Sequence, residues 1–320
     1  LQVAGIGEGD EVITTPISWV ATSNVVLSVG AKPVFIDIDP ITRNIDLNKL
    51  AAAITPKTRA IMPVYLAGLP VDMDQLYALA KQHNLRVIED AAQAFGSQWN
   101  GKKIGSFGDL VSFSFQANKN LTTIEGGCLV LNNADEAKLA EKFRLQGLTR
   151  QGMDGMDVDV LSGKDNLTDV NAVIGLEQLK QLPAYQSRRT ELARQYFAVL
   201  RSELQSAGLN DLGLELPVEN FTETNWHMFQ VLLPLERLTA DRAQVMTELK
   251  EQGIGSGVHY PIITGFTLYK NLGYQAADTP IANRIGRSIL TLPLFPAMTN
   301  EDIGRIAKGF VGILKKHRKN

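Results

Sequence analysis

The sequence predicts an α/β protein with a mainly parallel sheet flanked by helices, followed by a smaller C-terminal α+β domain. Between residues 10 and 132, short apolar runs alternate with segments of helical periodicity, which is typical of a buried, largely parallel sheet. Past residue 169 the pattern changes to long amphipathic stretches with few apolar runs. A chain of 320 residues is long enough for two domains. We expect these domains at residues 1–195 and 196–320.

Six short apolar runs of strand length lie in the first domain. They occupy residues 11–14, 33–39, 59–65, 86–90, 110–115 and 128–131. Apolar residues at helical spacing occupy residues 19–29, 47–54 and 74–84, between several of these strands. Pro63 argues against a central place for the third strand, because proline cannot donate a hydrogen bond to a neighbouring strand.

A long amphipathic helix, residues 172–207, is expected to bridge the two domains and to break near Pro183. Strands are expected beyond it at 229–233 and 258–260, and helices at 241–252, 283–290 and 301–316. This mixture of elements predicts the smaller α+β domain.

The composition argues against several classes of protein. A net charge of -2, with no basic run except residues 315–319, gives no indication of nucleic-acid binding. The single cysteine, Cys128, excludes a disulfide framework and favours the reducing cytoplasm. No apolar stretch is long enough to span a membrane. The four histidines lack the spacing of metal ligands, so we expect no metal site.

Two charged residues follow strand-like runs. Asp90 ends the run at 86–90, and Lys119 follows the run at 110–115. Ligands of such sheets bind outside the carboxyl ends of the strands. Pyridoxal phosphate needs an amine for a Schiff base and an acidic partner for its ring nitrogen. A carboxylate keeps that nitrogen protonated, and a partly desolvated lysine has a lowered pKa. The pair predicts an aminotransferase.

Each candidate residue also has a purely structural explanation. Asp90 alone could cap a helix, and most lysines, Lys119 included, would be exposed loop residues. Ser114 could donate to a phosphate or be a polar residue of a strand. Trp19 could stack on a flat ring or pack in the core. His259 could bind a ligand or be a hydrogen-bonded structural histidine.

Longer segments resemble the DegT-type sugar aminotransferases, a fold-type-I pyridoxal-phosphate family that works mainly on nucleotide-linked keto-sugars. The likeness runs through nearly the whole chain. It is carried by residues 9–13, 16–22, 30–34, 89–93, 114–127, 166–172, 253–260 and 292–295. The spacing from Ser114 to Lys119 and the Asp-Ala-Ala-Gln run at 90–93 are specific in combination.

The resemblance implies a role for each residue around the cofactor. Lys119 would form the Schiff base and carry the proton in both half-reactions. Asp90 would hold the ring nitrogen, and Gln93 would lie near the ring hydroxyl or the ring face. Trp19 would stack on the ring, and Ser114 would bind the cofactor phosphate.

The resemblance also implies a homodimer with shared active sites. Lys164 would reach the cofactor phosphate from the partner subunit, at a position where many members carry asparagine and the 4-amino-arabinose branch carries lysine. His259 would lie near the substrate. Asp165 replaces an aromatic residue common in the family, which affects the expected substrate contacts. The family's Ser/Gly-Thr-Ala helix start does not precede Gly5, so we expect a leading segment to be missing from this sequence.

We therefore predict a cytoplasmic, homodimeric aminotransferase of polysaccharide biosynthesis. It would move an amino group from an amino acid, with glutamate as the expected donor, to a keto-sugar that is expected to be nucleotide-linked. Pyridoxamine phosphate would be the intermediate between the half-reactions. Three alternatives stay open: an aminotransferase for a free keto-sugar acid, a non-catalytic regulatory member, and a sugar dehydratase. The dehydratases tend to carry histidine where Lys119 stands, so Lys119 argues against the last.

Overall fold

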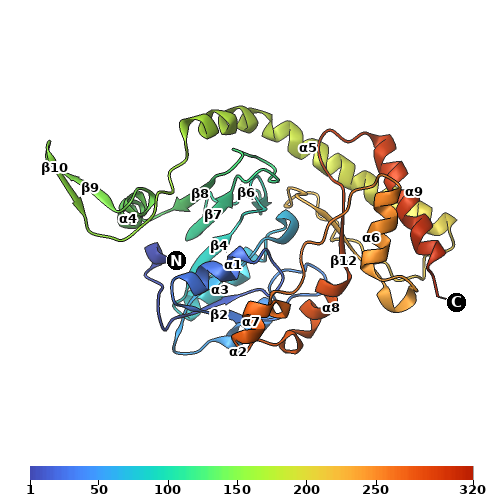
Figure 1. The fold of residues 1–320 in the computed structure, drawn as a ribbon, viewed down its shortest axis with the longest axis horizontal. Coiled ribbons are helices and arrows are strands. Elements are labelled where there is room, and N and C mark those ends of the chain that lie inside the picture. Colours follow the sequence, from blue (N-terminus) through green and yellow to red (C-terminus); the bar gives the residue numbers. More distant parts are fainter. Residues whose placement is uncertain (320) are drawn as a thin grey trace.

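The computed structural model describes residues 1–319. Its centre is a six-stranded sheet in the order β2-β1-β3-β4-β7-β8 (Figure 1). The first five of these strands run parallel, and β8 runs antiparallel to β7 at one edge. The strands are β1 (Glu11–Thr14), β2 (Lys32–Phe35), β3 (Thr58–Met62), β4 (Arg86–Asp90), β7 (Leu110–Ser114) and β8 (Gly127–Leu131).

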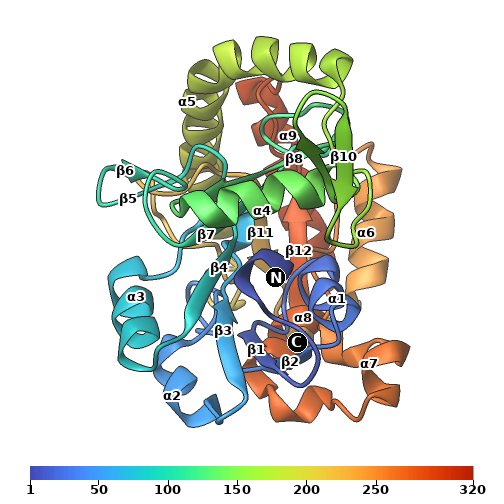
Figure 2. The ribbon, with the colours of Figure 1, turned by 90° about the vertical axis from the view of Figure 1, so that its left-hand side faces the viewer.

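Helices cover both faces of the sheet (Figure 2). Helices α2 (Leu50–Ala53) and α3 (Met73–Gln82) pack on the face that carries Ile13, Ile61 and Val87. Helix α1 (Ala21–Ser28) packs on the opposite face, on the intervening strand residues. Because both faces are buried, the central strands are apolar at consecutive positions, which is why the sequence predicted them.

A long helix, α5 (Asp169–Ser206), arches from the sheet to the C-terminal part of the chain (Figure 1). Thr168 begins it, because its side chain accepts a hydrogen bond from the Asn171 N–H at 3.3 Å. The predicted break at Pro183 is wrong, since the helix continues through this residue. Proline removes one backbone donor, and this 38-residue helix continues through that loss. The predicted domain boundary at residue 195 falls inside α5 and stays a prediction.

The C-terminal part is built around a core of aromatic residues. Tyr196 and Phe197 of α5 pack against Phe229, with ring centroids 4.6 and 5.1 Å away. Its two strands, β11 and β12, are antiparallel. Its elements are β11 (Phe229–Leu232), α6 (Arg242–Glu251), α7 (Thr267–Asn271), α8 (Pro280–Ser288), β12 (Ile289–Leu292) and α9 (Asn300–Lys316).

Several smaller elements were not predicted. Helix α4 (Ala134–Arg144) and the hairpin of β9 (Leu148–Gln151) and β10 (Gly155–Val158) form an arm at one end of the molecule (Figure 1). None of the residues of this helix is buried. The other short elements are β5 (Gln98–Trp99), β6 (Lys102–Lys103) and 3-10 helices at Gln2–Ala4, Leu66–Gly68, Leu235–Arg237, Ile263–Gly265 and Ala276–Asp278. A further 3-10 helix, Leu47–Lys49, leads directly into α2 and falls, with it, inside the helix predicted at 47–54.

Two predictions near the C-terminus need correction. Residues 258–260 form no strand; only the adjacent Gly257 bridges to Thr291 of β12. The helix predicted at 283–290 begins earlier, at Pro280, and gives way to β12 at Ile289. The prediction assigned residues 289 and 290, the first half of β12, to the helix, because a short apolar run does not distinguish helix from strand. Among residues 1–319, no helix combines the length and apolar character that crossing a membrane requires.

Strand β4 carries two consecutive acidic residues, which point to opposite faces of the sheet. Glu89 is completely buried. The hydroxyls of Tyr65 and Tyr77 donate to its two oxygens at 2.7 and 2.6 Å. Burial raises the pKa of Glu89 to about 7, although both hydrogen bonds act in the opposite direction.

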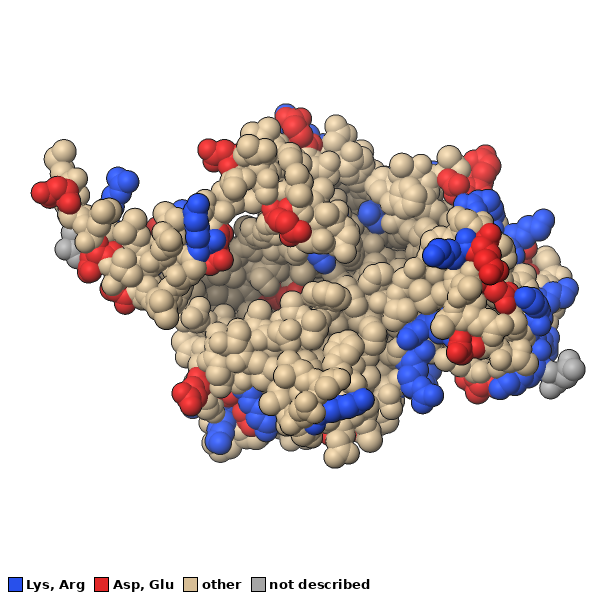
Figure 3. Space-filling model, viewed as in Figure 1, with Lys and Arg blue, Asp and Glu red and all other residues tan. Residues whose placement is uncertain are grey.

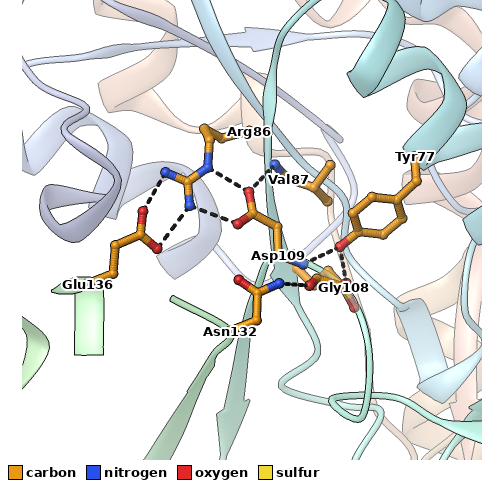
Figure 4. A network of polar contacts seen from close by, with 8 residues as sticks. Tyr77, Arg86, Val87, Gly108, Asp109, Asn132 and Glu136 are labelled. Carbon is orange, nitrogen blue, oxygen red and sulfur yellow. Dashed lines mark hydrogen bonds and ion pairs between the residues drawn. The ribbon is translucent and has the colours of Figure 1, made fainter. Parts of the chain in front are cut away.

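A polar network extends from Tyr77 towards the surface (Figure 4). Its hydroxyl accepts the backbone N–H of Asp109 at 2.8 Å. The Asp109 carboxylate accepts two hydrogen bonds from Arg86, at 2.7 and 2.8 Å. Arg86 also binds Glu136 of α4 at 2.8 Å. The network therefore joins the start of β4, the start of β7 and α4.

Glu89 is expected to make stability depend on pH. Its pKa is about 7 in the folded chain, against 4.5 as its ordinary value, so the folded state binds the proton more tightly. Stability then falls as pH rises from 4.5 to 7, by about 3 kcal/mol. In Glu89→Gln, which cannot ionise, urea unfolding should show a smaller decline between pH 5 and 8. The exposed Glu251→Gln should behave like the wild type. An unchanged decline in Glu89→Gln would contradict this assignment.

Candidate active site

A cavity opens where β4 and β7 end. Asp90 closes β4 opposite Ser112 of β7, so the segments that follow the two strands emerge side by side. The cavity has a volume of about 430 Å³, which suits a small ligand. Figure 3 shows a hollow beneath α5, with charged atoms of both signs inside it. The residues that line the cavity are Trp19, Ser114, Gln116, Asn118, Lys119, His259 and Tyr260.

Lys119 carries a half-buried amine on the cavity wall. Within residues 1–319, no acidic side chain lies within ion-pair distance of it. Burial lowers the pKa of Lys119 below its ordinary value, and the negative charge of Asp90 partly opposes this. Its backbone N–H donates to the Gln116 carbonyl at 2.9 Å, which fixes the loop. A lysine in this state loses its proton more easily and can act as a nucleophile or base.

Asp90 is held by two donors. The Thr22 hydroxyl of α1 donates to Oδ2 at 2.6 Å, and the Ala92 N–H donates to Oδ1 at 3.2 Å. Ser18 lies 2.8 Å from the Thr22 hydroxyl. Burial raises the pKa of Asp90, while these donors and the charge of Lys119 lower it. The carboxylate is therefore oriented, and each of its oxygens already accepts a hydrogen bond on one side.

Ser114 and Trp19 present free chemical groups to the cavity. The Ser114 hydroxyl accepts the Gln116 N–H at 3.3 Å, and its own hydrogen has no acceptor within residues 1–319. It can therefore donate to a ligand. Trp19 is 62% exposed, and its ring centroid lies 6.1 Å from that of Tyr260. An exposed indole on a cavity wall offers a flat face to an aromatic ring.

His259 and Tyr260 form the wall contributed by the C-terminal part. His259 Nδ1 lies 2.9 Å from the Thr291 hydroxyl. Burial and the charge of Lys119 lower the pKa of His259 below its ordinary value, so the imidazole is neutral at pH 7. Burial and the charge of Asp90 raise the pKa of Tyr260 to about 12, so its hydroxyl keeps its proton.

Gln93 does not line the cavity. Its Oε1 accepts the Ala67 N–H at 2.8 Å, and its Nε2 donates to the Tyr260 hydroxyl at 3.3 Å. Gln93 therefore holds Tyr260 from behind. The structure brings together Trp19, Ser114, Lys119 and His259, and places Asp90 close enough to influence the pKa of Lys119.

Lys164 lies apart from these residues, on the arm. Its backbone pairs with Leu145, the residue that follows α4. The side chain is exposed and is not among those lining the cavity. Figure 1 shows the arm pointing away from the sheet. Within one subunit, Lys164 does not complete the site.

The segment 224–228 supports the site, although none of its residues lines the cavity. Asn225 donates to the Gln93 and Phe95 carbonyls at 2.8 and 3.0 Å. Its own carbonyl accepts a hydrogen bond from Asn120, the neighbour of Lys119, at 3.2 Å. His227 Nδ1 lies 2.9 Å from the Asn120 side-chain oxygen. The C-terminal part thus fixes both loops of the site.

Sequence reasoning missed three of these residues: Thr22, Tyr260 and Asn225. Thr22 and Tyr260 lie inside quoted motifs, at 16–22 and 253–260, but nothing in their spacing indicated which atoms they contact. Asn225 is more than a hundred residues from both loops that it joins. Only the folded chain shows such a contact.

The comparison with protein families is decisive at this point. A model of the DegT/DnrJ/EryC1/StrS aminotransferase family matches residues 1–311. The chain belongs to this family. The resemblance noted in the sequence is therefore confirmed.

Known proteins resemble the chain over nearly its whole length. The spore coat polysaccharide biosynthesis protein SpsC of Bacillus subtilis (strain 168) is 38% identical over 329 residues, covering 98% of this chain and 82% of that protein. The putative sugar aminotransferase Spr1654 from Streptococcus pneumoniae, in its PLP-form, has a TM-score of 0.86 at 31% identity, covering 99% of this chain and 83% of that one. Helicobacter pylori PseC, an aminotransferase involved in the biosynthesis of pseudoaminic acid, has a TM-score of 0.88 at 28% identity, covering 97% and 81%.

This chain is therefore a pyridoxal-phosphate-dependent sugar aminotransferase with the predicted α/β fold. The residues of the cavity fit this cofactor. The wall offers an amine with a lowered pKa, a hydroxyl with a free hydrogen and an exposed indole, and the half-buried carboxylate of Asp90 lies nearby. When bound, the cofactor supplies an electron sink for the carbon that gains or loses the amino group.

Thr22→Val is expected to weaken cofactor binding without unfolding the protein. The substitution removes the hydrogen bond that the Thr22 hydroxyl donates to the Asp90 carboxylate. Loss of this bond should raise the pKa of Asp90 further. Such a bond contributes about 1.5 kcal/mol, or roughly a 10-fold change in Kd for pyridoxal phosphate. Absorbance titration would measure it. Thr42→Val removes a similar bond, to Asp39 at 2.9 Å, and should leave Kd unchanged. Equal effects of the two substitutions would contradict the role of Thr22.

Proposed function

We propose that this enzyme is a cytoplasmic homodimer that transfers an amino group from glutamate to a nucleotide-linked keto-sugar in polysaccharide biosynthesis. The observation that carries the catalytic part is the half-buried amine of Lys119, which lies on the cavity wall and has no ion-pair partner among residues 1–319. Two of the similar proteins support a role in polysaccharide biosynthesis and a sugar acceptor: SpsC is a spore coat polysaccharide biosynthesis protein, and PseC is an aminotransferase involved in the biosynthesis of pseudoaminic acid.

Each residue has a defined task in this proposal. Lys119 would hold the cofactor through its amine, and the same amine would take a proton from the substrate carbon and return one. Asp90 balances the positive charge of the ring nitrogen, and Thr22 keeps it in position. Ser114 donates to the cofactor phosphate, and Trp19 covers one face of the ring. His259, neutral at pH 7, faces the substrate.

Gln93 acts through Tyr260 in this proposal. Its amide fixes the Tyr260 hydroxyl, and Tyr260 closes the cavity beside His259. Gln93 would therefore influence the ring hydroxyl or the ring face of the cofactor only through Tyr260.

Exposed apolar side chains support the homodimer. The N-terminal half of α5 exposes Val170, Val173, Leu176 and Leu179 by 73, 60, 60 and 47%. Contiguous apolar surface of this kind marks a protein–protein contact. The segment that carries Lys164 leads directly into this part of the chain, because α5 begins at Asp169. A second copy of the chain would cover α5 and receive the partner's arm at its cavity.

Lys119→Ala should abolish transamination while keeping the fold. The wild type with pyridoxal phosphate should show a visible absorbance band that bleaches with glutamate. The variant should show neither effect, and turnover should fall by about 1,000-fold or more, the scale of losing a catalytic acid–base. Lys57→Ala, at an exposed lysine, is the control. A wild type without the band would favour a non-catalytic member, and a band indifferent to glutamate would mean another donor.

Co-expression of Lys119→Ala and Lys164→Ala chains tests the shared site. Each variant alone should be inactive or weak. A mixed dimer would contain one intact site if Lys164 acts across the interface, so random pairing should restore about a quarter of the activity. Mixing Lys119→Ala with Ser114→Ala should restore nothing, because both residues belong to one cavity. Absence of restoration in the first mixture would refute the partner role of Lys164.

A further inference from the structure

His259 lines the active-site cavity, and the two strands of the C-terminal part hold it in place. Its carbonyl accepts a hydrogen bond from Gln230 Nε2 of β11 at 2.5 Å. Its ring nitrogen Nδ1 lies 2.9 Å from the hydroxyl of Thr291 on β12. The backbone of Thr291 pairs with that of Gly257 through two hydrogen bonds, of 2.8 and 3.0 Å. Thr291 is therefore fixed beside the imidazole ring.

Gly257 leaves the space that the imidazole ring occupies. A Cβ atom added at this residue would lie 2.6 Å from His259 Cε1, which is closer than side-chain carbons approach one another. The ring also packs against Tyr260, with centroids 5.2 Å apart and planes nearly perpendicular. These contacts keep Nδ1 turned towards Thr291.

The contact with Thr291 decides which ring nitrogen of His259 carries the proton. Within residues 1–319, the Thr291 hydroxyl has no hydrogen-bond partner other than His259 Nδ1, and Thr291 is buried. If Nδ1 carried the proton and donated it, the hydroxyl hydrogen of Thr291 would be left without an acceptor, which is unfavourable for a buried donor. If the hydroxyl donates to Nδ1 instead, both groups are satisfied. Nδ1 is then the unprotonated nitrogen.

The other ring nitrogen, Nε2, is free to contact a ligand. No hydrogen bond joins it to residues 1–319, and it is accessible rather than buried. The lowered pKa of His259 makes the neutral imidazole the main form at pH 7. A neutral imidazole with an unprotonated Nδ1 carries its proton on Nε2. The ring therefore has an N–H to offer to a ligand in the cavity that it lines.

We propose that Thr291 holds His259 in the neutral form protonated at Nε2, so that His259 donates a hydrogen bond to an oxygen atom of the substrate and does not act as a base. This inference rests on the proposed function, in which His259 faces the substrate. The substrate atom opposite Nε2 is a hydrogen-bond acceptor, and an N–H group at that place would be rejected. Thr291 is a positioning residue, and Lys119 remains the base of the cavity.

Nitrogen NMR of the holoenzyme tests the protonation of the ring directly. The chain has 4 histidines, so a sample labelled with ¹⁵N-histidine gives few signals. The signals of His259 are those that disappear in His259→Gln. Protonated and unprotonated ring nitrogens differ widely in ¹⁵N shift. At pH 8, the wild type should show an unprotonated Nδ1 and a protonated Nε2 for His259.

Substitutions at Thr291 test its role in the same spectra. Thr291→Val keeps the shape of the side chain and removes the hydroxyl, so His259 should become a mixture of its two neutral forms. Thr291→Ser should restore the wild-type shifts. Thr247→Val is the control, at an exposed threonine whose hydroxyl donates to the Ala243 carbonyl, and should leave the shifts of His259 unchanged. A protonated Nδ1 in the wild type, or unchanged shifts in Thr291→Val, would overturn the proposal.

A second pair of variants reaches the same contact through the backbone. Gly257→Ala should displace the ring from Thr291 and give the same mixture of neutral forms. Gly255→Ala is its matched control, because an added Cβ there meets nothing within 4 Å. Wild-type shifts in Gly257→Ala would contradict the fixed orientation of the ring.

A kinetic measurement separates a hydrogen-bond donor from a base. His259→Gln keeps an N–H donor but cannot take up a proton. Single-turnover bleaching of the absorbance band by glutamate should therefore slow by less than about 10-fold, whereas loss of a general base costs about 100-fold or more. A loss above 10-fold would overturn the proposal. A wild type whose band does not bleach with glutamate would refute the proposed donor, while the NMR spectra would still decide the protonation of His259.

Discussion

The register of β4 decides which of two adjacent carboxylates faces the cofactor cavity. Glu89 and Asp90 are consecutive, so their side chains point to opposite faces of the sheet. A slip of one residue would exchange them. On one face, Tyr65 and Tyr77 accommodate Glu89, and on the other, Thr22 accommodates Asp90. Each carboxylate therefore finds hydrogen-bond donors only on its own face of the sheet. The site depends on Asp90, and not Glu89, lying on the face of Thr22.

The same network fixes β4 along its length. Arg86, at the start of the strand, is bound by Asp109, whose backbone N–H donates to Tyr77. Tyr77 in turn binds Glu89, so one connected set of hydrogen bonds spans most of the strand (Figure 4). The raised pKa of Glu89 shows that burying this carboxylate is costly. A buried charged group that is fully hydrogen-bonded gives specificity of register rather than stability.

The sequence predicted the sheet because its central strands are buried on both faces and read as continuous apolar runs. It predicted Lys119 and Asp90 because they follow such runs. It did not predict α4 and the arm: Leu139 and Phe143 are the only large apolar residues of this helix, and none of its residues is buried. The first two residues of β12, Ile289 and Leu290, were assigned to the predicted helix at 283–290. Residues 280–292 contain both the helix α8 and the strand β12. The boundary between them is set by the pairing of Ile289 with Leu232, which the local sequence pattern does not reveal.

The sequence did not predict contacts between distant segments, and these contacts matter most for the position of Lys119. Asn225 binds the loop of Gln93 and the loop of Asn120 at once. This requires a close approach at Gly68, whose φ is +87° and where an added Cβ would overlap the Asn225 side chain. Arg189 of α5 secures the segment by donating to the Trp226 carbonyl at 3.2 Å. A shift of the C-terminal part would therefore move the loops that carry Lys119 and Gln93, so the amine keeps its position relative to Asp90 only while the two parts stay docked.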